Sequence, residues 1–76
     1  MIVGIFGTVL RELREKNNLS QEKLAEFCDL DRTYISLLER GLRQPTITTL
    51  FRLSNALKIK PSDLVVMVEA KLSGKL

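Results

Sequence analysis

The sequence contains no histidine and no tryptophan, and it has a single cysteine, Cys28. Without histidine or a second thiol, it lacks the residue sets that form zinc sites and internal disulfides. A glycine-rich loop of the kind that binds phosphate groups is also absent. The glutamates are the remaining candidates for catalysis, and their positions fit the solvated faces of helices. We therefore expect neither an enzyme nor a cofactor, metal ion or small-molecule ligand.

Long hydrophobic stretches are missing as well. The longest uninterrupted apolar run, residues 64–68, is far shorter than a membrane span. Residues 1–6 are mostly apolar, but no basic region precedes them and no cleavage site follows, which argues against a signal peptide. The lone Cys28 is expected to be a small buried hydrophobe in a reducing environment. These features predict a cytoplasmic protein that does not contact membranes.

The composition favours one small globular domain over residues 1–76. The sequence is 45% hydrophobic and 28% charged, with a formal net charge of +3. A chain of this length buries only about 60% of its unfolded surface, so its stability margin is small. Apolar residues recur every three or four positions and almost nowhere every second position, which predicts an all-α fold. The expected helices cover residues 5–17, 21–28, 32–40, 46–58 and 61–72, and residues 73–76 are expected to fray.

Residues suited to helix ends stand at these boundaries. Ser20, Asp31 and Thr46 can each accept a hydrogen bond from an unpaired backbone N–H at a helix start. Gly41 suits the left-handed conformation in which many helices end. Asp29 and Leu30 form the corner between the second and third helices.

The inward positions of the helical pattern predict the core. In the third helix only Ile35 and Leu38 lie at good core positions, so that helix has an extensive polar face. Solvation is the ordinary explanation for such a face on a single helix. The expected core comprises Phe6, Val9, Leu10, Leu13, Leu24, Ala25, Phe27, Cys28, Leu30, Ile35, Leu38, Ile47, Leu50, Leu53, Ala56 and Leu57.

Residues 20–41 predict two short helices joined by a tight corner, the arrangement called helix-turn-helix. In this motif the second helix enters the major groove of DNA with its N-terminal end first. Arginine can bond a guanine twice, serine and threonine bond either kind of base edge, and methyl groups contact thymine. The outer face of the third helix offers these residue types at Arg32, Thr33, Ser36 and Leu37.

A family resemblance supports this interpretation. Residues 5–65 resemble the lambda-repressor-like DNA-binding domains of the Cro/cI type. Residues 30–36 (LDRTYIS), followed by Glu39, Arg40 and Arg43, also resemble the controller proteins of restriction–modification systems. The residues that carry the wider resemblance are Arg14, 19–25 (LSQEKLA), 34–41 (YISLLERG), Pro45, Leu50, Leu53, Ala56, Leu57 and 61–64 (PSDL).

The resemblance implies a role for each matching polar residue. Arg14 and Glu39 would form a structural ion pair between the first and third helices. Base contacts would come from the start and outer face of the third helix, at Arg32, Thr33, Tyr34, Ser36 and Leu37. Contacts to the DNA backbone would come from Gln21, Arg40, Arg43 and Gln44, and Gln21 would also brace the recognition helix. Members of the family usually carry glycine at the corner occupied here by Asp29, which implies a positive φ that aspartate tolerates better than most residues.

The last helix is apolar on more than one side, which indicates a second role besides covering the core. Exposed apolar patches mark partner sites, and two-fold dimers are the commonest oligomers. Burial within the monomer is the alternative. A dimer would place two recognition helices about 34 Å apart, on successive turns of one DNA face. The expected dimer interface comprises Ile59, Leu64, Val65, Met67, Val68 and Leu72.

The expected function is that of a homodimeric transcription regulator on a pseudo-palindromic operator. The stretch 20–44 is not basic overall, so binding would depend on individually placed contacts and on the doubled site. A restriction–modification controller is the favoured interpretation, followed by a phage or plasmid repressor. An antitoxin-type interaction module that also binds its operator is the other alternative.

Overall fold

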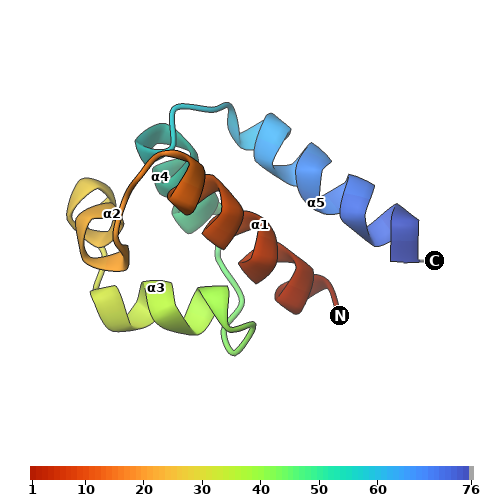
Figure 1. Cartoon of the computed structure of the whole chain (residues 1–76), viewed down its shortest axis with the longest axis horizontal. Coiled ribbons are helices and arrows are strands. Elements are labelled where there is room, and N and C mark those ends of the chain that lie inside the picture. Colours follow the sequence, from red (N-terminus) through yellow and green to blue (C-terminus); the bar gives the residue numbers. More distant parts are fainter. Residues whose placement is uncertain (76) are drawn as a thin grey trace.

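The computed structural model describes residues 1–75, which form five helices joined by short loops (Figure 1). The all-α prediction is confirmed, and α2 begins and ends where it was expected. Within the described residues there is no strand. The helices are α1 (Ile2–Lys16), α2 (Gln21–Cys28), α3 (Arg32–Glu39), α4 (Ile47–Ala56) and α5 (Pro61–Lys75).

The two terminal helices are longer than predicted. α1 contains Gly4 and Gly7, and glycine is a poor helix former. The helix nevertheless begins at Ile2, because its first turns pack on the core through Ile5 and Phe6. α5 continues to Lys75, so residues 73–75 do not fray as expected. Leu72 packs against the core and supports the last turns of that helix. Residue 76, which was also expected to fray, lies outside the described residues.

The predicted caps of α2, α3 and α4 are confirmed by their hydrogen bonds, whereas α4 ends at Ala56, two residues before its predicted end. Ser20 Oγ accepts from the backbone N–H of Lys23 at 3.0 Å, and Asp31 Oδ2 accepts from that of Thr33 at 3.1 Å. Thr46 caps α4 in the same way. The corner between α2 and α3 has the expected left-handed residue, at φ 56° and ψ 45°. These devices fix the direction in which α3 leaves α2.

Asp29→Gly should leave the denaturation midpoint unchanged or raise it. Asp29 supplies the positive φ at this corner, and glycine populates that region without a steric cost. The carbonyl of residue 29, which accepts a hydrogen bond from Arg52, is retained in the variant. Urea unfolding followed by circular dichroism measures the effect. Asp31→Ala is the matched control, since losing that cap should cost about 1 kcal/mol; a clear fall for Asp29→Gly would contradict the prediction.

Most of the expected core is buried, but two of its members are not. Phe27 and Ile47 are 60% and 70% exposed, so their assignment to the core was wrong. Leu24, Ala25 and Cys28 already fill the inner face of α2, which turns Phe27 outward beside Lys23. Ile47 is the first residue of α4, where its side chain stays exposed.

Two residues expected at a dimer interface belong to the core. Leu64 and Val68 lie one turn apart on the inner face of α5 and are buried within the monomer. Within the monomer they present little surface of their own, so their place at a dimer interface stays a prediction. Ile59 and Leu72 are partly buried against the same core. Val65 and Met67 remain exposed, on different sides of α5, because two residues advance a helix by about 200°.

The helices are arranged around α1. This helix packs against both α3 and α5, while α2 contacts α3 and α4, and α4 contacts α5. Figure 1 shows α3 along one edge of the molecule and α5 along another, with α1 between them. The polar face of α3 is consequently turned away from the core, at the surface of the molecule.

Candidate nucleic-acid interface

α3 is held to the rest of the protein by one face only. Ile35 and Leu38 are fully buried, whereas Arg32 and Thr33 at the start of the helix are exposed. Ser36, Leu37 and Tyr34 are intermediate. The structure therefore brings Arg32, Thr33, Ser36 and Leu37 together along the exposed side of α3, whereas Tyr34 packs partly against the core. The N-terminal end of α3 is the part of this helix most exposed to solvent.

A nearly buried ion pair joins α3 to α1, between the two residues that the resemblance implied. Arg14 Nε donates to Glu39 Oε2 at 2.6 Å, and Arg14 Nη2 donates to Glu39 Oε1 at 3.1 Å. The two side chains are only 12% and 3% exposed. The hydrogen bonds to Glu39 raise the pKa of Arg14 above its ordinary value. Arg14 also donates to the carbonyl of Leu19 at 2.8 Å, which ties the α1–α2 loop to the same group.

Further hydrogen bonds connect the ion pair through Gln21 to Arg32, the first residue of α3. Gln21 Nε2 donates to Glu39 Oε1 at 3.0 Å, and Arg32 Nη1 donates to Gln21 Oε1 at 3.2 Å. Because the amide nitrogen of Gln21 faces a carboxylate, its oxygen faces Arg32. The resulting hydrogen-bond chain runs from Arg14 through Glu39 and Gln21 to Arg32. The spacing of residues gave no signal for the bond between Gln21 and Arg32.

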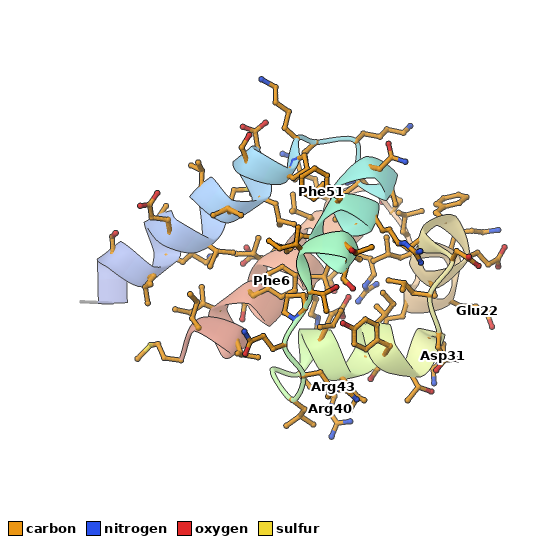
Figure 2. The ribbon with its side chains drawn as sticks, turned by 180° about the vertical axis from the view of Figure 1, so that it is seen from behind. Phe6, Glu22, Asp31, Arg40, Arg43 and Phe51 are labelled. Carbon is orange, nitrogen blue, oxygen red and sulfur yellow. The ribbon has the colours of Figure 1, made fainter. Side chains whose placement is uncertain are left out.

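Tyr34 lies where α3 meets α4 and the loop after α3. Its hydroxyl is 3.5 Å from Thr49 Oγ1, and the guanidinium of Arg43 lies 5.6 Å from the ring centroid. A cation over an aromatic face is attracted by the ring quadrupole. Tyr34 therefore supports Arg43, a contact that the sequence did not indicate. Figure 2 shows Arg40 and Arg43 at one end of α3 and Asp31 at the other.

The electrostatic balance of this surface is more favourable for an anion than the sequence suggested. Glu39 is neutralised by Arg14 and buried. Among the ion pairs formed within residues 1–75, none involves Arg32, Arg40 or Arg43. Three exposed guanidinium groups thus lie on or beside α3, and Gln44 is exposed next to them. They provide the kind of contact that positions a protein on phosphate groups.

Other kinds of site find little support in the part of the chain that the structure describes. Residues 1–75 include no group of three or more histidine, cysteine, aspartate or glutamate side chains placed to hold a metal ion. No described helix has the length and apolar character needed to cross a bilayer. Cys28 is buried, as predicted, and burial raises the pKa of its thiol to about 11.

α2, the left-handed corner and the exposed α3 define a helix-turn-helix domain. Residues 10–64 match the family model described as helix-turn-helix, and the chain belongs to this family. It is 48% identical over 62 residues to the control protein C.BamHI of Bacillus amyloliquefaciens, which covers 80% of this chain and 76% of that protein. The resemblance noted from the sequence is therefore confirmed.

Two solved structures extend the similarity to three dimensions. The restriction–modification controller protein C.AhdI of Aeromonas hydrophila is 44% identical, with a TM-score of 0.79, over 82% of this chain and 94% of that one. The controller protein C.Esp1396I was solved as a tetramer in complex with its natural 35 base-pair operator. It is 30% identical, with a TM-score of 0.84, over 92% of both chains.

An apolar groove lies beside the candidate DNA-binding surface. Its volume is about 490 Å³, and α1, the loop before α4, α4 itself and α5 all contribute to it. Ile47, wrongly assigned to the core, lies on its rim. None of the lining residues is charged, and they are Ile2, Val3, Phe6, Gln44, Pro45, Thr46, Ile47, Leu50, Leu64, Val65 and Val68.

Proposed function

We propose that this chain is a sequence-specific DNA-binding transcription regulator of the restriction–modification controller type, acting as a homodimer on a pseudo-palindromic operator. The observation that carries the proposal is the exposed start of α3, where Gln21 orients Arg32 above a buried ion pair. The similarity to C.Esp1396I, which was solved in complex with its operator, supports DNA binding by this chain. In this proposal the protein works in the cytoplasm, has no catalytic activity and responds to its own concentration.

The contacts divide by their place on this surface. Arg32 and Thr33 are the most exposed residues at the start of α3 and would contact base edges first. Tyr34, Ser36 and Leu37 would contact bases farther along the helix. Contacts to phosphate groups would come from Gln21, Arg40, Arg43 and Gln44.

Selection of bound fragments from a random DNA pool tests the proposal. We expect a two-fold motif whose half-sites are about ten base pairs apart, because a dimer places its recognition helices one DNA turn from each other. Failure to enrich any motif would contradict sequence-specific binding. A neighbouring methyltransferase or endonuclease gene would favour the controller, whereas a neighbouring toxin gene would favour the antitoxin alternative.

Arg32→Ala should weaken operator binding by about 1–3 kcal/mol and relax the preference at one base pair of each half-site. Arg32 is the guanidinium that Gln21 directs from the exposed end of α3. Binding to a set of operators that differ at single positions measures both effects. Arg11→Ala is the control, since Arg11 is exposed on α1 and its ion pair within residues 1–75 is with Glu15. If Arg32→Ala weakened binding to every operator equally, Arg32 would instead contact a phosphate group of the DNA backbone.

We infer that the dimer forms through the apolar groove and its rim. Each copy carries a net charge of +3, so two copies meet most readily where the surface has no charge. Ile47 and Phe51 lie one turn apart on the exposed side of α4, and Val65 faces the groove from α5. Gln44 and Pro45 line the same groove, so a partner bound there lies next to the DNA-contacting loop.

This interface differs from the one expected from the sequence. Leu64 and Val68 contribute to the floor of the groove rather than to an outer face of α5. Ile59 lines a second hollow with Phe51 and Pro61. Met67 lies on the same side of α5 as Lys71, which pairs with Glu12 of α1, and we leave it outside the proposed interface.

A further inference from the structure

Gly7 lies where α1 crosses the last turn of α3, and the two backbones are unusually close there. A Cβ atom at Gly7 would lie 2.4 Å from the carbonyl oxygen of Leu38 and 2.6 Å from that of Glu39. Both are backbone atoms, so no flexible side chain can move aside. A methyl group would therefore displace α3 from α1 by about 1 Å, from 2.4 Å to the 3.4 Å of ordinary contact.

A second close approach, between Gly41 on the loop after α3 and Gly4 of α1, continues this contact. Gly41 has a positive φ of 73°, and a Cβ there would lie 3.0 Å from the Cα of Gly4. Gly4 itself has open space around the position of its own Cβ, with nothing within 4 Å. We call Gly7 and Gly41 the glycine contact. It sets the separation of α1 from the end of α3, where Glu39 also bonds Arg14.

The glycine contact links the recognition helix to the groove. The same first turns of α1 that approach α3 also supply Ile2, Val3 and Phe6 to the groove. Farther along, α1 packs on α5 and pairs with it through Glu12 and Lys71 at 3.4 Å. Figure 1 shows α1 between α3 and α5. A change in how α3 sits on α1 therefore moves the recognition helix relative to the surface that would hold a second copy.

We propose that Gly7 is a positioning residue for simultaneous binding of two operator half-sites, an inference that rests on the proposed function. In a two-fold dimer, a displacement of α3 relative to its own groove occurs in both copies and changes the separation of the two recognition helices. The gain from bivalent binding is lost when the geometry prevents both sites from being occupied together. Binding to a single half-site needs only one recognition helix, so it is retained when α3 is displaced.

Gly7→Ala and Gly4→Ala form a matched pair, because each adds one methyl group to α1. Titration of a labelled full operator and of a fragment with one half-site measures the two kinds of binding. Gly7→Ala should lose about tenfold or more in affinity for the full operator and less than about threefold for the single half-site. Gly4→Ala should change neither affinity, since within the described residues its methyl group would lie more than 4 Å from every atom outside its own stretch of α1.

Three results would overturn the proposal. Unchanged affinity of Gly7→Ala for the full operator would show that the contact does not set the geometry. Equal losses on full and half-sites would make Gly7 a purely structural residue. If Gly7→Ala does not fold, the double variant with Gly4→Ala, which raises helix propensity, is measured instead; failure of that variant to fold also overturns the positioning role. The unmodified protein is titrated first, and absence of specific binding there contradicts the proposed function rather than this inference.

Discussion

Glu39→Ala is expected to lower the free energy of unfolding by about 3–5 kcal/mol, because it leaves the Arg14 guanidinium largely buried without its partner. A domain of 76 residues has a total stability of about 4–11 kcal/mol. The single substitution therefore removes a large part of the stability, and much of the population should unfold near physiological temperature. Thermal and urea unfolding followed by circular dichroism measure the loss.

The control is an ion pair of the same chemistry that differs in its surroundings. Arg11 and Glu15 are 3.4 Å apart on α1, with side chains 64% and 56% exposed. Exposed pairs contribute about 0–1 kcal/mol, so Glu15→Ala should have a small effect. If Glu39→Ala and Glu15→Ala lowered the free energy of unfolding by similar amounts, the structural importance of the buried pair would be contradicted.

Replacing both partners separates stability from DNA recognition. Buried ion pairs can often be replaced by apolar residues of similar volume without loss of stability, so Arg14→Met combined with Glu39→Leu should recover much of what Glu39→Ala loses. The same double variant removes the carboxylate that orients Gln21. A stable variant with weakened preference at the base pair contacted by Arg32 is the expected outcome, and this would assign the hydrogen-bond chain a role in recognition as well as in folding.

The features that could be predicted from the sequence depend on interactions within a few residues. Ser20, Asp31 and Thr46 bond backbone groups two or three positions away, and Asp29 has only to tolerate its own φ. The inner faces of α1 and α3 follow from a single apolar stripe. For these elements the local pattern and the tertiary structure require the same conformation, so the starts of α2, α3 and α4 and the corner of the motif were predicted closely.

The features that could not be predicted depend on which of two acceptable faces packs inward. Phe27 and Ile47 fit the apolar period of their helices but lie outside the faces that are already filled. In α5 the apolar run offers several faces, and only packing against α1 and α4 decides that Leu64 and Val68 turn inward. Gly7 gave no signal at all, because its importance arises from a backbone approach by residues more than thirty positions away.

Val65→Asp should abolish dimerisation and reduce affinity for the full operator by about 100-fold or more. Val65 lines the charge-free groove, so an aspartate there would be removed from water on association without a partner. Two-fold symmetry would also repeat that charge on the second copy. Sedimentation equilibrium measures the mass in solution, and titration of full and single half-sites measures the effect on DNA. Affinity for a single half-site should change little.

The neighbouring residue provides a closely matched control. Val66 has the same side chain and similar exposure, 56% against 50% for Val65, but it does not line the groove. Val66→Asp adds the same charge to the same turn of α5, so it controls for helix propensity, net charge and repulsion from DNA. The mass of this variant and its operator affinity should match those of the unmodified protein. Disruption by Val66→Asp alone would place the dimer interface on the outer side of α5, and an effect of neither substitution would exclude both faces of that helix.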